Sequence, residues 1–336
     1  MAQISYLPLG NRISARLGRL IETVSQLPPC RWSLDVLRRM GLTGRSIVII
    51  VPSIWLLLFF LIPFVILLKI SLAETRFGQQ PRYGPLFEWT DANLMLIQLH
   101  FEHYRALFSE WLYFGAFLSS LKVASISTIL CLLVGYPMAY GIARADASWR
   151  NTLLLLVILP FWTSFLVRIY AWIGLLRNNG LINNVLIGLH IIDEPIVMMQ
   201  TDFAMYIGIV YAYLPFMILP LYSNLEKHDN TLLEAAVDLG ATPVRAFMRV
   251  TLPLSMPGVI AGCMLVFIPA VGEFVIPRLL GGNDTLMIGR VLWDEFFSAG
   301  DWPRASAVAI LLLLVLVIPI MVFQYFQAKE TSAAHR

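Results

Sequence analysis

Two charged residues lie inside long apolar stretches of this sequence, where an ionised side chain is costly and usually has a function. Arg168 lies in PFWTSFLVRIYAW, and Glu273 lies in FIPAVGEFVIP. A carboxylate or a guanidinium at membrane depth can bind a charged solute, pair with an opposite charge, or extend to the membrane surface. For each residue, both a solute-binding role and a purely structural role stay open.

Acids and aromatic residues also lie at or near the ends of the apolar stretches. Carboxylates concentrate cations near a pathway, and aromatic ring faces attract an ammonium group. The candidate solute-pathway residues are Glu273, Trp162, Asp202, Phe274, Trp293, Asp294 and Glu295. A structural alternative stays open, because Lys and Arg are normally kept on the inner side of a membrane and Trp is common at both interfaces.

Recognisable catalytic patterns are absent from the sequence. It contains no GxxxxGKS or GxxxxGKT, no GxSxG and no HExxH. The three cysteines are far apart, so they support neither a disulfide framework nor a zinc site. We therefore predict no catalytic residue, no metal, no cofactor and no binding of nucleic acid.

The composition predicts an all-α membrane protein. Of 336 residues, 58% are hydrophobic and only 13% are charged, so the excess apolar surface must face lipid. Six stretches each supply the roughly 20 residues that one helical crossing requires. These six predicted transmembrane helices are 47–68, 114–143, 152–176, 203–225, 257–276 and 305–326. Several contain proline, which favours a packed bundle, and Gly258 with Gly262 permits a close helix contact.

The distribution of charge predicts that both termini are cytoplasmic. With the N-terminus inside, segments 1–45, 144–151, 226–255 and 327–336 contain 14 of the 24 Lys and Arg residues. Acids show the opposite bias, because 12 of the 21 fall in the outer segments. The positive-inside rule therefore places the loop between the fourth and fifth helices on the inner side.

That loop contains a polar segment, EAAVDLGATPVRAFMRVTLP, which spans residues 234–253. Thr231 and Glu234 have the spacing of a capping box, and Gly240 suits the left-handed end of a short helix. Thr242 followed by Pro243 is typical of the start of a second helix. The segment is thus predicted to be a helix–turn–helix on the membrane surface.

The same segment resembles the EAA loop of binding-protein-dependent ABC importer permeases. That loop reads Glu-Ala-Ala, three residues, Gly, nine residues, Ile, one residue and Leu-Pro; Val250 replaces the Ile here. The stretches LLLLVILPFWTSFLVRIYAWIGLLRNNG and FIPAVGEFVIPRLLGG resemble the putrescine permeases among the polyamine importers. The matching loop positions are Glu234, Ala235, Ala236, Gly240, Leu252 and Pro253.

The resemblance implies a fold, partners and roles for these residues. It implies a six-helix type I importer fold with coupling helices that dock on a separate cytoplasmic ATPase dimer. Glu234 would meet the ATPase, Ala235 and Ala236 would permit close contact, and Gly240 would allow the turn. It also implies a second, homologous permease in a heterodimer and a periplasmic polyamine-binding protein. A cation in the pathway would repel Arg168, so we expect Arg168 to be paired or turned away.

The predicted organisation is a cytoplasmic tail over 1–45 and a permease domain over 46–330, with its core at 114–326 and the EAA loop at 231–253. Two alternatives stay open. One is an ABC permease for spermidine, an amino acid or an anion. The other is an ATP-independent carrier, although such carriers usually contain an internal repeat and none is evident here.

Overall fold

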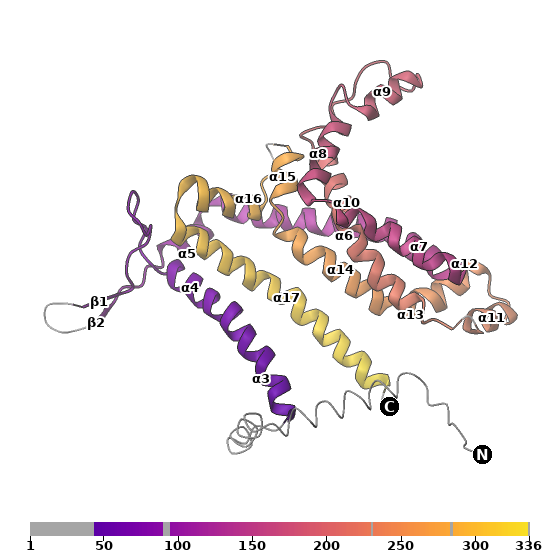
Figure 1. The fold of residues 1–336 in the computed structure, drawn as a ribbon, viewed down its shortest axis with the longest axis horizontal. Coiled ribbons are helices and arrows are strands. Elements are labelled where there is room, and N and C mark those ends of the chain that lie inside the picture. The colour runs from indigo at the N-terminus through magenta and orange to yellow at the C-terminus, as the bar shows by residue number, and fades with distance from the viewer. Residues whose placement is uncertain (1–43, 90–94, 230, 283–284, 335–336) are drawn as a thin grey trace, which may run out of the picture. The chain divides into compact units, whose positions relative to one another are not determined.

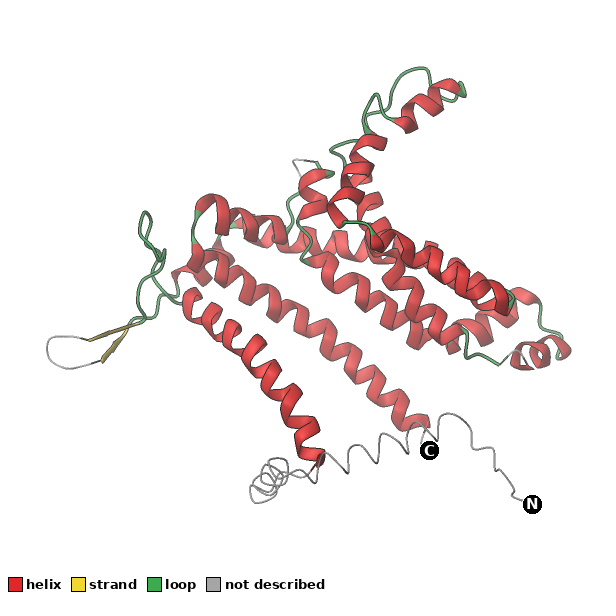
Figure 2. Cartoon of the chain, in the orientation of Figure 1, coloured by secondary structure: helices red, strands yellow, loops and turns green. Residues whose placement is uncertain are grey.

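A computed structural model describes residues 44–89, 95–229, 231–282 and 285–334 (Figure 1). The predicted cytoplasmic tail therefore lies almost entirely outside the described residues. The chain divides into two compact units, residues 1–66 and residues 67–336. Helices make up most of the described chain (Figure 2).

The first described span corresponds to the first predicted crossing. It is one continuous helical run whose apolar part, Val48–Ser71, is 24 residues long. The run begins in the first unit and its last residues belong to the second. Its parts are α3 (Gly44–Leu56), the π-helical turn η1 (Leu57–Leu61) and α4 (Ile62–Ser71).

Three long helices pack on one another to form the core of the second unit (Figure 1). Ala and Gly positions let them approach closely, and Met217, Ile218 and Leu221 fill the space between them with completely buried side chains. Helix α17 (Trp302–Ala334) packs against this core. The three core helices are α6 (Trp111–Arg144), α10 (Asp202–Leu225) and α14 (Met256–Val271).

The close contact predicted for the GxxxG pair is confirmed. A Cβ on Gly262 would lie 2.8 Å from Met217 Sδ, and one on Gly258 would lie 2.8 Å from the Asn224 Cβ. Both neighbours belong to α10, so the two glycines allow α14 to pack directly against that helix.

Replacing Gly262 with leucine is therefore expected to destabilise the protein by about 1–3 kcal/mol, the usual cost of overpacking a core. Gly141→Leu is the matched control, because no atom lies within 4 Å of a Cβ at Gly141 on α6. Thermal unfolding in detergent measures both variants. Equal midpoints for the two would contradict the close α10–α14 contact.

The third predicted crossing is broken rather than straight, because Ala147–Trp162 and Phe165–Gly188 meet at 91°. A second bend, of 63°, lies between Pro243–Leu254 and Met256–Val271, just before the fifth predicted crossing. Among the described residues, four helices alone are long and apolar enough to cross a membrane, or up to six if each bent pair is one span. The first pair comprises α7 (Ala147–Ile158), η2 (Leu159–Trp162), α8 (Phe165–Leu176) and α9 (Leu181–Gly188).

A proline and the residues after it explain the break in the third crossing. Pro160 lies in the 3-10 turn η2, and Thr163 and Ser164 after it are extended, which ends the helical hydrogen bonding. The fifth crossing, predicted to continue to residue 276, ends at Val271 in α14. The chain then leaves helical geometry before α15 (Val275–Leu279).

Several short elements lie at one end of the second unit, the end opposite the C-terminus of α10. They include one two-stranded antiparallel hairpin, in which Phe87 pairs with Ile97, and this hairpin is an addition to the predicted all-α fold. The elements are β1 (Phe87–Trp89), β2 (Met95–Ile97), α5 (Glu102–Ser109), α16 (Ile288–Trp293) and the π-helical turn η4 (Asp294–Ala299).

Candidate functional site

The polar segment folds as a helix–turn–helix, as predicted from its turn and cap residues. Gly240 has a φ of +81°, the left-handed region that favours glycine, and its N–H donates to the Val237 carbonyl at 2.8 Å. Thr242 is the extended residue before the second helix, and Pro243 is that helix's first residue. The elements are α11 (Thr231–Asp238), α12 (Pro243–Ala246), the π-helical turn η3 (Phe247–Thr251) and α13 (Leu252–Leu254).

The predicted Thr231–Glu234 capping box is wrong. Thr231 is the first residue of α11, and its N–H donates to Asp229 Oδ1 at 3.0 Å. This hydrogen bond from the Thr231 backbone lowers the pKa of Asp229 below its ordinary value. The Glu234 side chain is exposed, and its carboxylate makes no hydrogen bond or ion pair with any residue that the structure describes. Its carboxylate is consequently available to another molecule.

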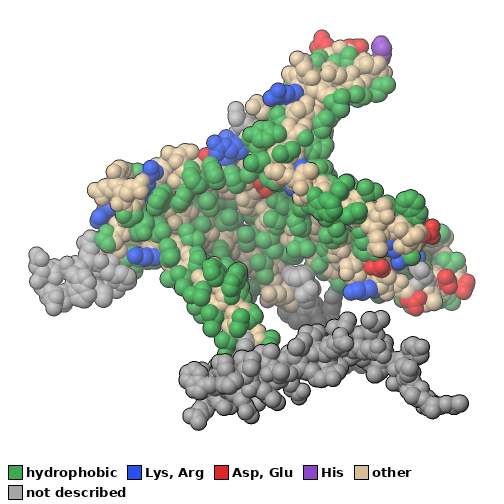
Figure 3. Space-filling model, in the orientation of Figure 1, with side chains coloured by type: hydrophobic (Ala, Val, Ile, Leu, Met, Phe, Trp, Pro, Cys, Tyr) green, Lys and Arg blue, Asp and Glu red, His purple; other side chains and the backbone are tan. Residues whose placement is uncertain are grey.

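Apolar side chains beside Glu234 are also exposed. Leu239 is 89% exposed, and Val237 and Val244 are likewise open to solvent. Ala235 is exposed and Ala236 is half-buried, so the two positions that follow the glutamate carry only small side chains. Acidic side chains gather at the end of the bundle where α11 lies (Figure 3). An acid beside exposed apolar residues is a typical composition for a surface that binds another protein.

Glu273 lies in the turn between α14 and α15, and not within a helix as its apolar surroundings predicted. It is 8% exposed. Its Oε2 accepts a hydrogen bond from the Tyr213 hydroxyl at 2.5 Å, and its Oε1 accepts from the N–H of Val275 at 3.0 Å. The Ile276 N–H points at the same oxygen at 3.4 Å. The carboxylate therefore caps α15 and ties it to α10.

Arg168 is buried, and of the two alternatives predicted for it, pairing with an acid is not observed among the described residues. Its guanidinium lies 4.7 Å from the ring centre of Phe161 and 5.7 Å from that of Phe165. Nε and Nη1 of Arg168 are buried and have no hydrogen-bond partner among the described residues. The ring faces supply part of the stabilisation that an acid would have supplied.

Four of the candidate pathway residues lie together. The rings of Phe274 and Trp293 stack with centres 4.5 Å apart, so Trp293 lies next to the turn that holds Glu273. Asp294 follows Trp293 and forms ion pairs with Arg278 at 3.8 Å and with Arg290 at 4.0 Å. The geometry joins a buried carboxylate, two stacked rings and a paired aspartate.

The other three candidates are placed elsewhere. Glu295 accepts a hydrogen bond from the Tyr113 hydroxyl at 2.6 Å. Asp202, at the start of α10, accepts one from Thr285 Oγ1 at 2.5 Å. Trp162 is 72% exposed on η2, which fits a side chain that faces lipid or another subunit. Sequence reasoning missed Tyr213, because an uncharged tyrosine in an apolar stretch carries no signal of its own.

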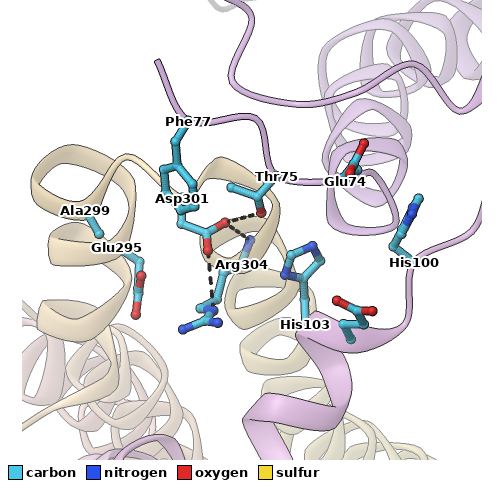
Figure 4. Close-up of a pocket in the computed structure, with 10 residues that line it drawn as sticks. Glu74, Thr75, Phe77, His100, His103, Glu295, Ala299, Asp301 and Arg304 are labelled. Carbon is cyan, nitrogen blue, oxygen red and sulfur yellow. Dashed lines mark hydrogen bonds and ion pairs between the residues drawn. The ribbon is translucent and has the colours of Figure 1, made fainter. Parts of the chain in front are cut away.

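A cavity of about 440 Å³ lies among α5, α17, η4 and the chain that precedes α5. Figure 4 shows Asp301 between Thr75 and Arg304 in this cavity. Thr75 Oγ1 donates to Asp301 Oδ1 at 2.9 Å, and Arg304 Nε lies 3.4 Å from Asp301 Oδ2. The lining residues are Glu74, Thr75, Phe77, His100, Glu102, His103, Glu295, Ala299, Asp301 and Arg304. Their hydrogen bonds join the loop before α5 to the start of α17.

Nearly the whole chain matches one protein-family model. Residues 31–332 match the binding-protein-dependent transport system inner membrane component. This chain belongs to that family. It is accordingly a multi-pass inner-membrane permease subunit of an ABC importer, and the α11–α13 loop is consistent with the family's EAA motif.

Curated relatives of this permease are similar over most of their length. The spermidine/putrescine transport system permease protein PotB of Haemophilus influenzae is 42% identical over 286 residues, which are 85% of this chain and 94% of that protein. PotB of Escherichia coli K12 is 44% identical over 238 residues, 71% of this chain and 86% of that protein.

A solved structure has the same fold as this permease. A chain of a bacterial alginate ABC transporter, crystallised in complex with an alginate-pentasaccharide-bound periplasmic protein, superposes with a TM-score of 0.64. The two chains are 16% identical, and the match covers 88% of this chain and 97% of the other. The expected type I importer permease fold is thereby confirmed.

Proposed function

We propose that this permease imports polyamines across the inner membrane, with putrescine as the preferred solute. The observation that carries the proposal is the 42% identity to a spermidine/putrescine permease over 85% of this chain. Relatives that share this much sequence usually share the class of solute they move.

The chemistry around Glu273 supports a cationic solute. Glu273 is buried beside two stacked aromatic rings, those of Phe274 and Trp293. An ammonium group can bind a carboxylate and a ring face together. In this proposal Asp202, Asp294 and Glu295 attract the cation toward the pathway, and Trp162 lines its edge.

Energy would reach this subunit through the α11–α13 loop. The chain has no phosphate-binding loop of its own, and Glu234 offers a free carboxylate beside exposed apolar residues. We assign Glu234, Ala235, Ala236, Gly240, Leu252 and Pro253 to contact with a cytoplasmic ATPase dimer. The chain has one such loop, so the two-fold ATPase requires a second, homologous permease, and a periplasmic polyamine-binding protein delivers the solute.

Uptake by the reconstituted importer tests the proposal. The permease is co-expressed with the second permease, the ATPase and the binding protein of its transport system, and placed in vesicles. We expect ATP-dependent uptake of radiolabelled putrescine, with spermidine as a weaker competitor and amino acids or oxyanions without effect. Competition by an amino acid or an oxyanion would replace the polyamine with that class of solute. Uptake without ATP would instead identify a carrier.

A further inference from the structure

The loop helix Pro243–Leu254 joins α14 through a 63° bend at Ser255. A bend between two helices can absorb movement, because a displacement of one helix can change the bend angle and leave the other helix in place. If the loop receives motion from an ATPase, something must hold this bend while the loop moves. The contacts around Ser255 supply such a support.

Ser255 is completely buried and is held from two sides. Its hydroxyl donates to the Leu252 carbonyl at 2.9 Å, and its backbone N–H donates to the Thr251 carbonyl at 2.9 Å. The hydroxyl of Tyr136 on α6 lies 2.9 Å from Ser255 Oγ. Since the serine proton is committed to Leu252, Tyr136 is the donor in this contact.

Phe247 braces the loop helix against the same part of α6. Its ring meets those of Tyr136 and Tyr140 edge-on, with centres 5.7 and 5.8 Å apart and interplanar angles of 87° and 88°. Edge-to-face pairs of this kind contribute roughly 0.5–1.5 kcal/mol each beyond the area they bury. Tyr136 and Tyr140 are one helical turn apart, so Phe247 lies against one face of α6.

The contacts fall where α6 is able to flex. Pro137, next to Tyr136, has no N–H and cannot bond to the carbonyl one turn earlier, which weakens the helix at that level. Helix α6 packs against both α10 and α14. A displacement that reaches Tyr136 is therefore delivered to all three core helices.

We propose that Tyr136, Ser255 and Phe247 form a brace that transmits movement of the α11–α13 loop into α6. They are positioning residues for transport: they touch neither solute nor nucleotide. The brace rests on the proposed function of the loop and deepens it, because it names the route from the loop to the core. Without the brace, the loop would still engage the ATPase, but its motion would be lost at the Ser255 bend.

Two tyrosine variants on the same helix turn test the brace. Tyr136→Phe removes only the hydroxyl that holds Ser255, whereas Tyr140→Phe removes a hydroxyl with no hydrogen bond to any described residue. Both keep the ring against Phe247. In vesicles containing the complete importer, putrescine uptake and ATP hydrolysis stimulated by the loaded binding protein are measured together. For Tyr136→Phe we expect the amount of putrescine transported per ATP hydrolysed to fall about fivefold, which is the factor expected for the loss of one hydrogen bond. The rate of ATP hydrolysis should be retained. Tyr140→Phe should match the parent.

Ser255→Ala removes the same contact from the other side, and the double variant with Tyr136→Phe should be no worse than Ser255→Ala alone. Phe247→Leu should also lower solute moved per ATP, and Phe247→Tyr should restore it. An unchanged ratio in Tyr136→Phe, an equal fall in Tyr140→Phe, or a parallel loss of hydrolysis and uptake would overturn the brace. Absence of ATP-dependent uptake by the parent importer would instead overturn the proposed function.

Discussion

Replacing Glu234 with lysine is expected to abolish solute uptake while the folded protein remains in the membrane. Glu234 is exposed and bonds to no described residue, so the change costs the fold little. In the proposed complex, the lysine puts a positive charge where the ATPase contacts the negative charge of Glu234. Loss of one partner of a buried charge pair at an interface costs roughly 2–5 kcal/mol. We therefore expect uptake and stimulated hydrolysis to fall together by about 100-fold or more.

The control for charge reversal is Asp146→Lys. Asp146 is exposed, makes no capping hydrogen bond, and lies in the other predicted inner loop between α6 and α7. Uptake by this variant should match that of the parent. Uptake by Glu234→Lys at the rate of the parent would contradict the coupling role of Glu234. So would labelling of Leu239→Cys from outside intact cells by a membrane-impermeant maleimide, since Leu239 is 89% exposed beside Gly240.

Replacing Glu273 with glutamine is expected to lower putrescine uptake at limiting solute by about tenfold or more. Glutamine keeps one oxygen that can accept from the Val275 N–H, and its NH2 group can donate to the Tyr213 hydroxyl oxygen, so the cap on α15 can persist. What it lacks is the negative charge, and hydrogen bonds to a charged group contribute roughly 1.5–3 kcal/mol. The loss should raise the KM for putrescine while the thermal midpoint stays near that of the parent.

Two further variants separate solute binding from capping. Tyr213→Phe leaves the charge on Glu273 but removes its hydroxyl donor, so we expect a smaller change in KM. Glu273→Ala leaves the Val275 and Ile276 N–H groups without their acceptor and should lower stability by about 1–3 kcal/mol. If Glu273→Gln transports at the parental rate and only Glu273→Ala is unstable, the carboxylate serves to hold α15 and has no contact with solute.

Local chemistry was enough to predict much of the fold. Long apolar stretches must be helices in lipid, because the backbone has no other partner there. The turn at Gly240 and the helix start at Pro243 follow from the properties of those two residues and are confirmed. The capping box predicted for Thr231 and Glu234 was wrong, because three polar residues in a row compete to cap α11 and their spacing cannot decide among them. Asp229 supplies the oxygen.

Hydropathy could not predict where the crossings break. The residues around Pro160 and Gly272 are as apolar as their neighbours, and proline inside a membrane helix can produce either a kink or a complete break. The neighbouring helices decide, since they must satisfy the freed backbone groups. Here a carboxylate does so after Gly272, where Glu273 caps α15. Its position in a turn therefore became visible only in three dimensions.

By itself the sequence determined the membrane class, the number of apolar stretches, the helix–turn–helix at 231–253 and the resemblance that the family match bears out. These depend on composition and on residues close together in the chain. Only the tertiary structure decided which side chains meet. Tyr213 and Glu273 are 60 residues apart, Tyr136 and Ser255 are 119 apart, and the Arg168 guanidinium lies over the Phe161 ring. Such pairs follow from how α6, α10 and α14 pack, and packing depends on the shapes of whole helices.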